Sequence, residues 1–245
     1  MSDDRPDLGA LERVAREVAA EWEVELGERF RFARYSYVAP AGDDAILKVT
    51  PPEDDESDEE ADALALWDGD GAVRLLRRDR ERRALLLERA RPGGDLSTVP
   101  EVEATAIAVE VARRLRRPAG APFRSIHDHV PRWLANGRAP RFALDLYERL
   151  EKRADTLVHG DFHHQNVLRS DRGWLAIDPK PYLGEPEYDV PSFLWNPLPT
   201  RLRNVEARIV AFVAAGLDEE RIRAWTVIRG AYLQPELADE LHALV

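Results

Sequence analysis

The sequence predicts a two-lobed α+β fold, because strand-like and helix-like segments occupy different parts of the chain. Most of the short apolar runs with the alternation of strands fall before residue 90, whereas segments with helical periodicity dominate afterwards. A stretch rich in proline and glycine, Arg91–Asp95, separates the two parts. We therefore expect a small antiparallel-sheet lobe over residues 1–90 and a larger helical lobe over residues 91–245.

The first ninety residues carry patterns of both helix and strand. Apolar side chains at helical intervals predict a helix over residues 6–26, and alternating aromatic and polar side chains predict a strand over residues 30–38. Seven of the eight residues from Glu53 to Glu60 are acidic, which predicts a solvated loop, and Ser57 and Glu60 have the spacing of a capping box. The remaining segments expected here are strands at 45–49, 73–76 and 84–88, a helix at 61–67 and a charged turn at 77–83.

The residues after 95 have a mainly helical pattern. Asp189 stands immediately before one of these segments and is expected to cap it. Two short apolar strands, 167–168 and 174–177, interrupt the helices and are joined by a turn. The helical segments are expected at 100–117, 123–135, 140–153, 189–195, 201–215 and 218–244.

The composition limits the possible classes of protein and partner. The 245 residues contain no cysteine, which excludes disulfides, thiolate metal sites and cysteine nucleophiles. The net charge of -11 opposes binding to nucleic acid. Taken alone this charge indicates only solubility, although the same field would attract a cationic small molecule. The longest wholly apolar run, Ile209–Leu217, is about half as long as a membrane span, and no signal peptide is visible. We therefore expect a cytoplasmic protein without a membrane partner, and its oligomeric state stays open.

The residues that suggest chemistry lie in one stretch of the C-terminal part. An apolar pair leads into His159, Gly160 and Asp161. Asn166 comes shortly after Asp161, and a later strand ends in Asp178. The hairpin between them would bring two carboxylates and one amide oxygen to a single end of a short ribbon. Such oxygen ligands suit Mg²⁺ that carries nucleotide phosphates, and the remaining carboxylate can accept the proton of a hydroxyl during phosphoryl transfer.

This stretch resembles the catalytic core of the aminoglycoside phosphotransferase family, which is related to the protein kinases. The family pattern is His-Gly-Asp-x-x-x-x-Asn followed by an aspartate at a strand end. Asp178-Pro-Lys180 and the sequence Gly-Glu-Pro-Glu-Tyr-Asp at 184–189 look most like its streptomycin 6-kinase and hydroxyurea-kinase branch. Residues 66–76 and 84–93 are also similar to that branch, so the resemblance covers roughly residues 30–195.

The resemblance implies a protein-kinase-like fold and an ATP-dependent O-phosphotransferase that acts on a small hydroxylated molecule. An aminoglycoside such as streptomycin is the first candidate acceptor, hydroxyurea the second, and another metabolite hydroxyl the third. Asp161 would be the catalytic base, and Asn166 and Asp178 would hold Mg²⁺.

The resemblance also implies a nucleotide site for ATP in the N-terminal lobe. Lys48 would contact the α- and β-phosphates and pair with a helical acid, for which both Glu60 and Glu59 are candidates. The main chain around Glu88 and Ala90 would be the hinge that binds adenine. There is no Gly-x-Gly-x-x-Gly sequence between the first strands, so the element that covers the phosphates stays unassigned.

Three alternatives accompany these assignments. The chain could be a pseudoenzyme that binds nucleotide without transferring phosphate. His159, His163 and His164 could suggest a metal hydrolase, but adjacent side chains in a loop diverge, and we expect His159 to support the loop instead. Lys180 could approach a phosphate or form a local salt bridge, and we favour the salt bridge.

Overall fold

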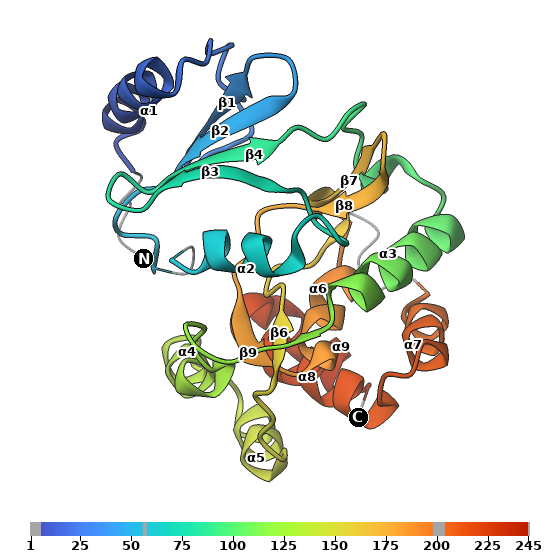
Figure 1. The fold of residues 1–245 in the computed structure, drawn as a ribbon. Helices are drawn as coiled ribbons and strands as arrows, with labels where there is room; N and C mark the ends of the chain where they lie inside the picture. The colour runs from blue at the N-terminus through green and yellow to red at the C-terminus, as the bar shows by residue number, and fades with distance from the viewer. Residues whose placement is uncertain (1–5, 56–57, 198–203, 245) are drawn as a thin grey trace.

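The computed structural model describes residues 6–55, 58–197 and 204–244, and it has two lobes (Figure 1). A four-stranded antiparallel sheet with two helices forms the smaller, N-terminal lobe at the top of Figure 1, and helices dominate the larger lobe below it. The α+β fold class expected from the sequence is confirmed. No helix in the described ranges is long and apolar enough to cross a membrane.

The N-terminal sheet has one face covered by a helix and the other turned toward the second lobe. The elements of this lobe are α1 (Leu8–Trp22), β1 (Tyr37–Ala41), β2 (Ala45–Val49), α2 (Glu60–Trp67), β3 (Leu75–Asp79) and β4 (Ala84–Glu88), and the sheet order is β1-β2-β4-β3. Alternate residues of β1 and β2, among them Ala39 and Leu47, are buried with Ala15 and Val18 of α1. Because side chains alternate along a strand, Lys48 of β2 faces the other lobe.

The C-terminal lobe is organised around a long helix near the end of the chain. Its helices are α3 (Glu101–Leu115), α4 (Val130–Asn136), α5 (Arg141–Arg149), α6 (Val190–Leu194), α7 (Val205–Ala214), α8 (Glu219–Leu233) and α9 (Ala238–His242). Its strands are β5 (Arg117–Pro118), β6 (Thr156–Val158), β7 (Val167–Ser170), β8 (Gly173–Ala176) and β9 (Tyr182–Gly184). Helix α8 contacts α4, α5, α6, α7 and α9, and Trp225 and Ile228 of α8 are fully buried. The strands form a β5-β6-β9 sheet and a β7–β8 hairpin.

The β7–β8 hairpin joins the two lobes. The N–H of Val73 donates to the carbonyl oxygen of Ala176 (3.0 Å), and the N–H of Ala176 donates to that of Gly71 (2.8 Å). In the hairpin turn, Arg172 donates to both carboxylate oxygens of Glu88 at 2.8 and 2.6 Å. The end of β4 and the connection before β3 are therefore attached to the hairpin that leads into Asp178.

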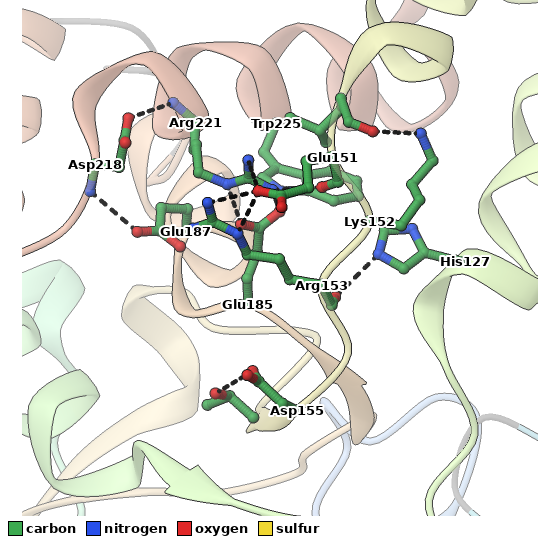
Figure 2. A network of polar contacts seen from close by, with 12 residues as sticks. His127, Glu151, Lys152, Arg153, Asp155, Glu185, Glu187, Asp218, Arg221 and Trp225 are labelled. Carbon is green, nitrogen blue, oxygen red and sulfur yellow. Dashed lines mark hydrogen bonds and ion pairs between the residues drawn. The ribbon is translucent and has the colours of Figure 1, made fainter.

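A buried ion pair fastens the segment after β9 to α8 (Figure 2). The Glu185 carboxylate accepts hydrogen bonds from the Arg221 guanidinium and from Nε1 of Trp225 (2.6 Å). At the start of α8, the N–H of Asp218 donates to Glu187 (3.0 Å), and the Asp218 carboxylate caps the helix. These contacts hold the chain downstream of Asp178 in a fixed position on the helical lobe.

The strand expected over residues 30–38 is wrong. Strand β1 begins only at Tyr37, and the chain before it forms the other arm of a hairpin, in which the N–H of Gly27 donates to the carbonyl oxygen of Pro40 (2.8 Å). Residues 28–36 form the end of this hairpin. Their alternating pattern buries no complete face, because two of the aromatic side chains are at least 70% exposed.

Three other expected boundaries also differ from the structure. The charged turn at 77–83 is shorter than expected, because β3 continues to Asp79 as an edge strand with solvent-facing arginines. The helix expected at 123–135 is confined to α4 and is preceded by a 3-10 turn. The helix expected at 218–244 is divided at Pro235, which ends α8 and separates it from α9.

The capping box, one helix start and three short strands remain to be compared with the structure. Ser57 lies outside the described residues, as do residues 201–203 of the helix expected at 201–215. The Glu60 carboxylate binds Lys48, and the side chain of Glu59, the N-cap residue of α2, makes no capping hydrogen bond. Strands β5, β6 and β9 were not expected, because two or three residues are too few to show an alternating pattern.

Candidate active site

Lys48 and Glu60 form a buried ion pair in the N-terminal lobe. The Lys48 ammonium nitrogen lies 2.8 and 2.7 Å from the two Glu60 carboxylate oxygens, and both side chains are buried. The Glu59 carboxylate instead lies 2.9 Å from the Arg124 guanidinium of the other lobe. Of the two acids left open by the sequence, the structure therefore brings Glu60 to Lys48.

Asp178 of the C-terminal lobe joins this pair. Its Oδ1 lies 2.5 Å from Nζ of Lys48, and its side chain is 46% exposed. Burial disfavours the Lys48 cation, but the carboxylates of Asp178 and Glu60 outweigh burial and raise the pKa of Lys48. Burial likewise opposes ionisation of Asp178, yet the Lys48 and Lys180 cations hold its pKa below the usual value. The site thus contains a charged lysine and an ionised aspartate.

Asp161 and Asn166 lie together in the loop that follows β6. The side-chain nitrogen of Asn166 donates to the main-chain oxygen of Asp161 (2.9 Å) and to its Oδ2 (3.1 Å). The Asp161 side chain is 40% exposed, and its Oδ2 lies 3.5 Å from Nε2 of His163. Burial would raise the pKa of Asp161, but the contact with His163 and the nearby charges of His159 and Arg229 together outweigh burial, and the pKa falls to about 2. Asp161 is therefore an accessible, ionised carboxylate.

The main chain before Asp161 is held tightly by buried groups. Gly160 has φ +82, and a Cβ at this position would lie 1.8 Å from the carbonyl oxygen of Lys180. The Asp189 carboxylate accepts hydrogen bonds from the N–H groups of His159 and Gly160, both at 2.8 Å. His159 is fully buried, and its Nε2 lies 3.0 Å from the Ile177 carbonyl oxygen, as its expected supporting role requires.

The expectation that Asp189 caps the following helix is wrong. It stands at the N-cap of α6 but makes no side-chain hydrogen bond to that helix, because its carboxylate binds the loop before Asp161. The sequence reasoning missed this role. A partner 29 positions away leaves no local pattern, although Asp189 lies in the recognised stretch 184–189.

Glu88 and Ala90 lie at the end of β4 and just beyond it. The Glu88 carboxylate is occupied by Arg172 and by the N–H of Arg74 (2.9 Å), so this side chain joins the lobes. Its main-chain N–H donates to the Arg74 carbonyl oxygen. Ala90 is half-buried and packs against the main core. Neither side chain lies in contact with Lys48 or Asp161.

Lys180 forms an ion pair between the lobes, whereas the loop histidines make local contacts. Nζ of Lys180 lies 2.8 Å from Oδ2 of Asp54, so Lys180 forms a salt bridge, but with the N-terminal lobe rather than with the local partner that was expected. His164 is buried and stacks on Phe193 at 4.1 Å, whereas His163 points toward Asp161. Within the described parts of the chain, no three His, Cys, Asp or Glu residues are placed to bind a metal together.

Asn166 and Asp178 match the ligand chemistry of Mg²⁺. The hydrogen bonds to Asp161 engage the amide nitrogen of Asn166, which turns the amide oxygen away from Asp161. The N–H of Ile177 donates to the main-chain oxygen of Asn166 (2.9 Å), so Asn166 lies beside the strand end that carries Asp178. One carboxylate and one amide oxygen are the hard ligands that Mg²⁺ takes alongside phosphate oxygens.

Comparison with known proteins places this geometry in context. Residues 30–234 match the family described as aminoglycoside/hydroxyurea antibiotic resistance kinase. The chain is 37% identical to a hydroxyurea phosphotransferase of Kitasatospora aureofaciens, over 77% of this chain and only 60% of that relative. It is 30% identical to a streptomycin 6-kinase of Streptomyces glaucescens, over 95% of this chain and 84% of that relative.

Solved structures show the same fold. The choline kinase LicA of Streptococcus pneumoniae superposes with a TM-score of 0.65 and 13% identity, over 96% of this chain and 90% of that one. At this identity the similarity concerns the fold alone. The protein-kinase-like fold expected from the motifs is confirmed.

Proposed function

We propose that the chain transfers the γ-phosphate of ATP to a hydroxyl group of a small molecule, because it belongs to the family of aminoglycoside/hydroxyurea antibiotic resistance kinases. One observation carries the proposal. Asp178 contacts Lys48 across the lobes, while the loop that Asp178 borders holds Asp161 and Asn166 together. A lysine, a carboxylate base and oxygen ligands for a metal are the parts that phosphoryl transfer requires.

Asp161 is proposed as the base. Its carboxylate is ionised and accessible, so it can orient the acceptor hydroxyl and accept the hydroxyl proton. A carboxylate of low pKa is a weak base. Phosphoryl transfer through a loose transition state tolerates this, because the attacking oxygen needs little added charge before the new bond forms.

The remaining site residues are proposed to bind the nucleotide. Lys48 would contact the α- and β-phosphates, and Glu60 would hold its ammonium group in place. Asn166 and Asp178 would hold Mg²⁺, which when bound neutralises negative charge on the phosphates. The main chain near Glu88 and Ala90 would bind adenine, as the resemblance implies.

The hairpin end at residues 28–36 is proposed as the element that covers the phosphates. Val38 lies opposite Lys48 in the sheet, and the N–H of Phe30 donates to the Val38 carbonyl oxygen (2.9 Å), so the hairpin extends past Lys48. This end contains no glycine. It instead carries Arg29, Arg31 and Arg34, whose positive charges are complementary to phosphate.

The proposed acceptor is an aminoglycoside such as streptomycin, with hydroxyurea and another metabolite hydroxyl as alternatives. The names of the two relatives support the first two choices. The net charge of -11 supports a cationic acceptor rather than a nucleic acid, because a negative field raises the local concentration of cations.

Transfer of labelled γ-phosphate from Mg-ATP to streptomycin, other aminoglycosides, hydroxyurea and simple alcohols tests the proposal. Label on one of these acceptors would support it and identify the substrate. In Asp161→Asn we expect turnover to fall by about 10²–10⁴-fold while ATP affinity is retained. Undiminished turnover in this variant would contradict the role of Asp161. ATP binding without transfer to any acceptor would contradict the proposed activity.

A further inference from the structure

We propose that Arg229 of α8 is a positioning residue for Asp161 and acts by holding the peptide group between Gly160 and Asp161. The inference rests on the proposed function, because it concerns the residue assigned there as the base. Arg229 lies 69 positions from Gly160 along the chain and in a helix without a recognised motif.

The Arg229 guanidinium is buried, and its hydrogen bonds go to main-chain oxygens. One terminal nitrogen donates to the carbonyl oxygen of Gly160 (2.8 Å), and the other donates to that of Tyr188 (2.7 Å). The guanidinium carbon lies 4.2 Å from the centroid of the Tyr188 ring, which adds a cation–π contact. The whole residue is only 3% exposed.

Packing alone does not explain a cation at this position. Burying a guanidinium is costly unless it is paired, and an apolar side chain of similar volume often stabilises a core as well or better. Across the described parts of the chain, no carboxylate lies in ion-pair contact with Arg229, and its Nε has no hydrogen-bond partner. The carboxylates that favour the cation, Asp189 and Asp161, act on it without direct contact and belong to the same loop region. The polar contacts of this buried cation are therefore concentrated on two carbonyl groups.

The contact with Arg229 is one of three constraints on the main chain of Gly160. The Gly160 N–H is held by the Asp189 carboxylate, and the Gly160 carbonyl by Arg229. The third direction is closed by the Lys180 carbonyl, which occupies the space of a Cβ. Because a peptide group is planar, fixing the Gly160 carbonyl also fixes the N–H of Asp161 and thus the start of that residue.

The position of Asp161 is the quantity that Arg229 controls. A displacement of about 1 Å at a reacting group can cost about 10²-fold in rate. Arg229 donates its hydrogen bonds to Gly160 and Tyr188, and not to Lys48, Glu60 or Asp178, which are proposed to bind the nucleotide. Loss of Arg229 should therefore lower kcat and leave the KM for ATP nearly unchanged.

The experiment compares Arg229→Met and Arg229→Lys with Arg221→Met as a matched control. Arg221 lies on the same helix and is also buried, but it binds Glu185 rather than the loop. For each variant kcat and KM for Mg-ATP are measured with the acceptor that takes label, or with water when none does. Turnover is divided by the number of folded molecules, which is determined from the amount of ATP that the sample binds at saturation.

We expect Arg229→Met to lower kcat per folded molecule by about 10- to 100-fold with KM changed less than twofold. Arg229→Lys should recover part of the loss, because an ammonium group can reach one carbonyl but lacks the two-pronged guanidinium. Arg221→Met should reduce the folded fraction and keep kcat per folded molecule near that of the wild type.

Two results would overturn the inference. One is wild-type kcat per folded molecule in Arg229→Met or, where that variant does not fold, in Arg229→Lys. The other is an equal loss of kcat in Arg221→Met. Asp161→Asn separates this inference from the proposed function. If Asp161→Asn is fully active, the proposed base is wrong, whereas inactive Asp161→Asn with unaffected Arg229 variants refutes the positioning role alone.

Discussion

At the scale of single residues, Gly160 is the glycine whose added Cβ would lie closest to another atom. Alanine at Gly160 would meet the Lys180 carbonyl oxygen at 1.8 Å, in addition to adopting an unfavourable positive φ. We expect Gly160→Ala to displace the loop and to lower turnover by at least about 10²-fold. Urea unfolding and steady-state turnover measure the two effects.

Gly216→Ala is the matched control for this prediction. Gly216 has a similar φ of +90, but no atom lies within 4 Å of the position of its Cβ. Its substitution should therefore cost only the backbone term, about 1–2 kcal/mol, and leave turnover unchanged. Equal losses of stability and turnover in the two variants would show that the close approach of Lys180 is unimportant.

Asp161 determines a second prediction at this scale, which concerns pH. The pKa of Asp161 is lowered to about 2, because the contact with His163 and the charges of His159 and Arg229 together outweigh burial. A carboxyl with a lower pKa in the folded than in the unfolded state stabilises the fold above about pH 3.9, and that stabilisation is lost as the pH falls toward 2. Between pH 5 and 8, Asp161 should therefore cause no acid limb in kcat/KM.

A pH profile of kcat/KM together with urea stability at low pH checks this expectation. His163→Gln removes the ring that lies 3.5 Å from Asp161 and should raise the pKa of Asp161 toward its usual value. The loss of activity would then begin at a higher pH than in the wild type. An acid limb near pH 6 that is identical in both proteins would instead point to a base other than Asp161.

At the scale of elements, the attachment of the β9 region to α8 depends on the Glu185–Arg221 pair. Glu185 is 2% exposed, and Arg221 has a second contact with the Glu151 carbonyl oxygen. Glu185→Ala would leave the Arg221 cation and the Trp225 N–H without this partner. We expect a loss of about 3–5 kcal/mol in the free energy of unfolding, measured by urea titration.

The Arg223–Glu206 pair is a matched control on the same helix. The Glu206 side chain is 64% exposed, so its interaction with Arg223 is screened by solvent. Glu206→Ala should change the free energy of unfolding by less than about 1 kcal/mol. Similar losses in the two variants would show that burial does not decide the strength of these pairs.

Elements with a local pattern could be predicted, and those that depend on distant partners could not. Strand β2 has the bounds expected from its apolar run, and helix α1 was expected from its periodic apolar face, although it spans Leu8–Trp22 rather than residues 6–26. Residues 30–38 show a similar alternation, but it is a hairpin end rather than a buried strand. Asp189 and Arg229 act on a loop 29 and 69 positions away, which leaves no periodic trace in the sequence.

In the candidate site, too, residues that share one local stretch could be predicted, and a choice that depends on distant partners could not. Asp161, Asn166 and Asp178 could be proposed as a group because they stand in one hairpin. The choice between Glu59 and Glu60 needed the structure, since adjacent residues of a helix point in different directions. Glu59 turns toward Arg124 and Glu60 toward Lys48.

At the scale of the whole molecule, ion pairs connect the two lobes around the site. Lys48 reaches Asp178 from the N-terminal lobe, and Arg172 reaches Glu88 from the C-terminal lobe. Lys180 also crosses between the lobes, to Asp54. Lys48 and Asp178 now bind each other. When a nucleotide and its metal bind, the phosphates would replace Asp178 as the partner of Lys48, and the metal would replace Lys48 as the partner of Asp178.

Mg²⁺ dependence of nucleotide binding is the prediction that belongs to this scale. A ligand that binds only the folded protein stabilises it by about 2.7 kcal/mol at one hundred times its Kd. We expect ATP with Mg²⁺ to raise Tm more than ATP with a chelator, because Asp178 would gain a cation while Lys48 turns to the phosphates. Asp178→Asn should keep the shift caused by ATP alone and lose the extra shift caused by Mg²⁺. Asp70→Asn, whose carboxylate pairs with Arg114 instead, should behave as the wild type. An undiminished Mg²⁺ effect in Asp178→Asn would place the metal on other residues.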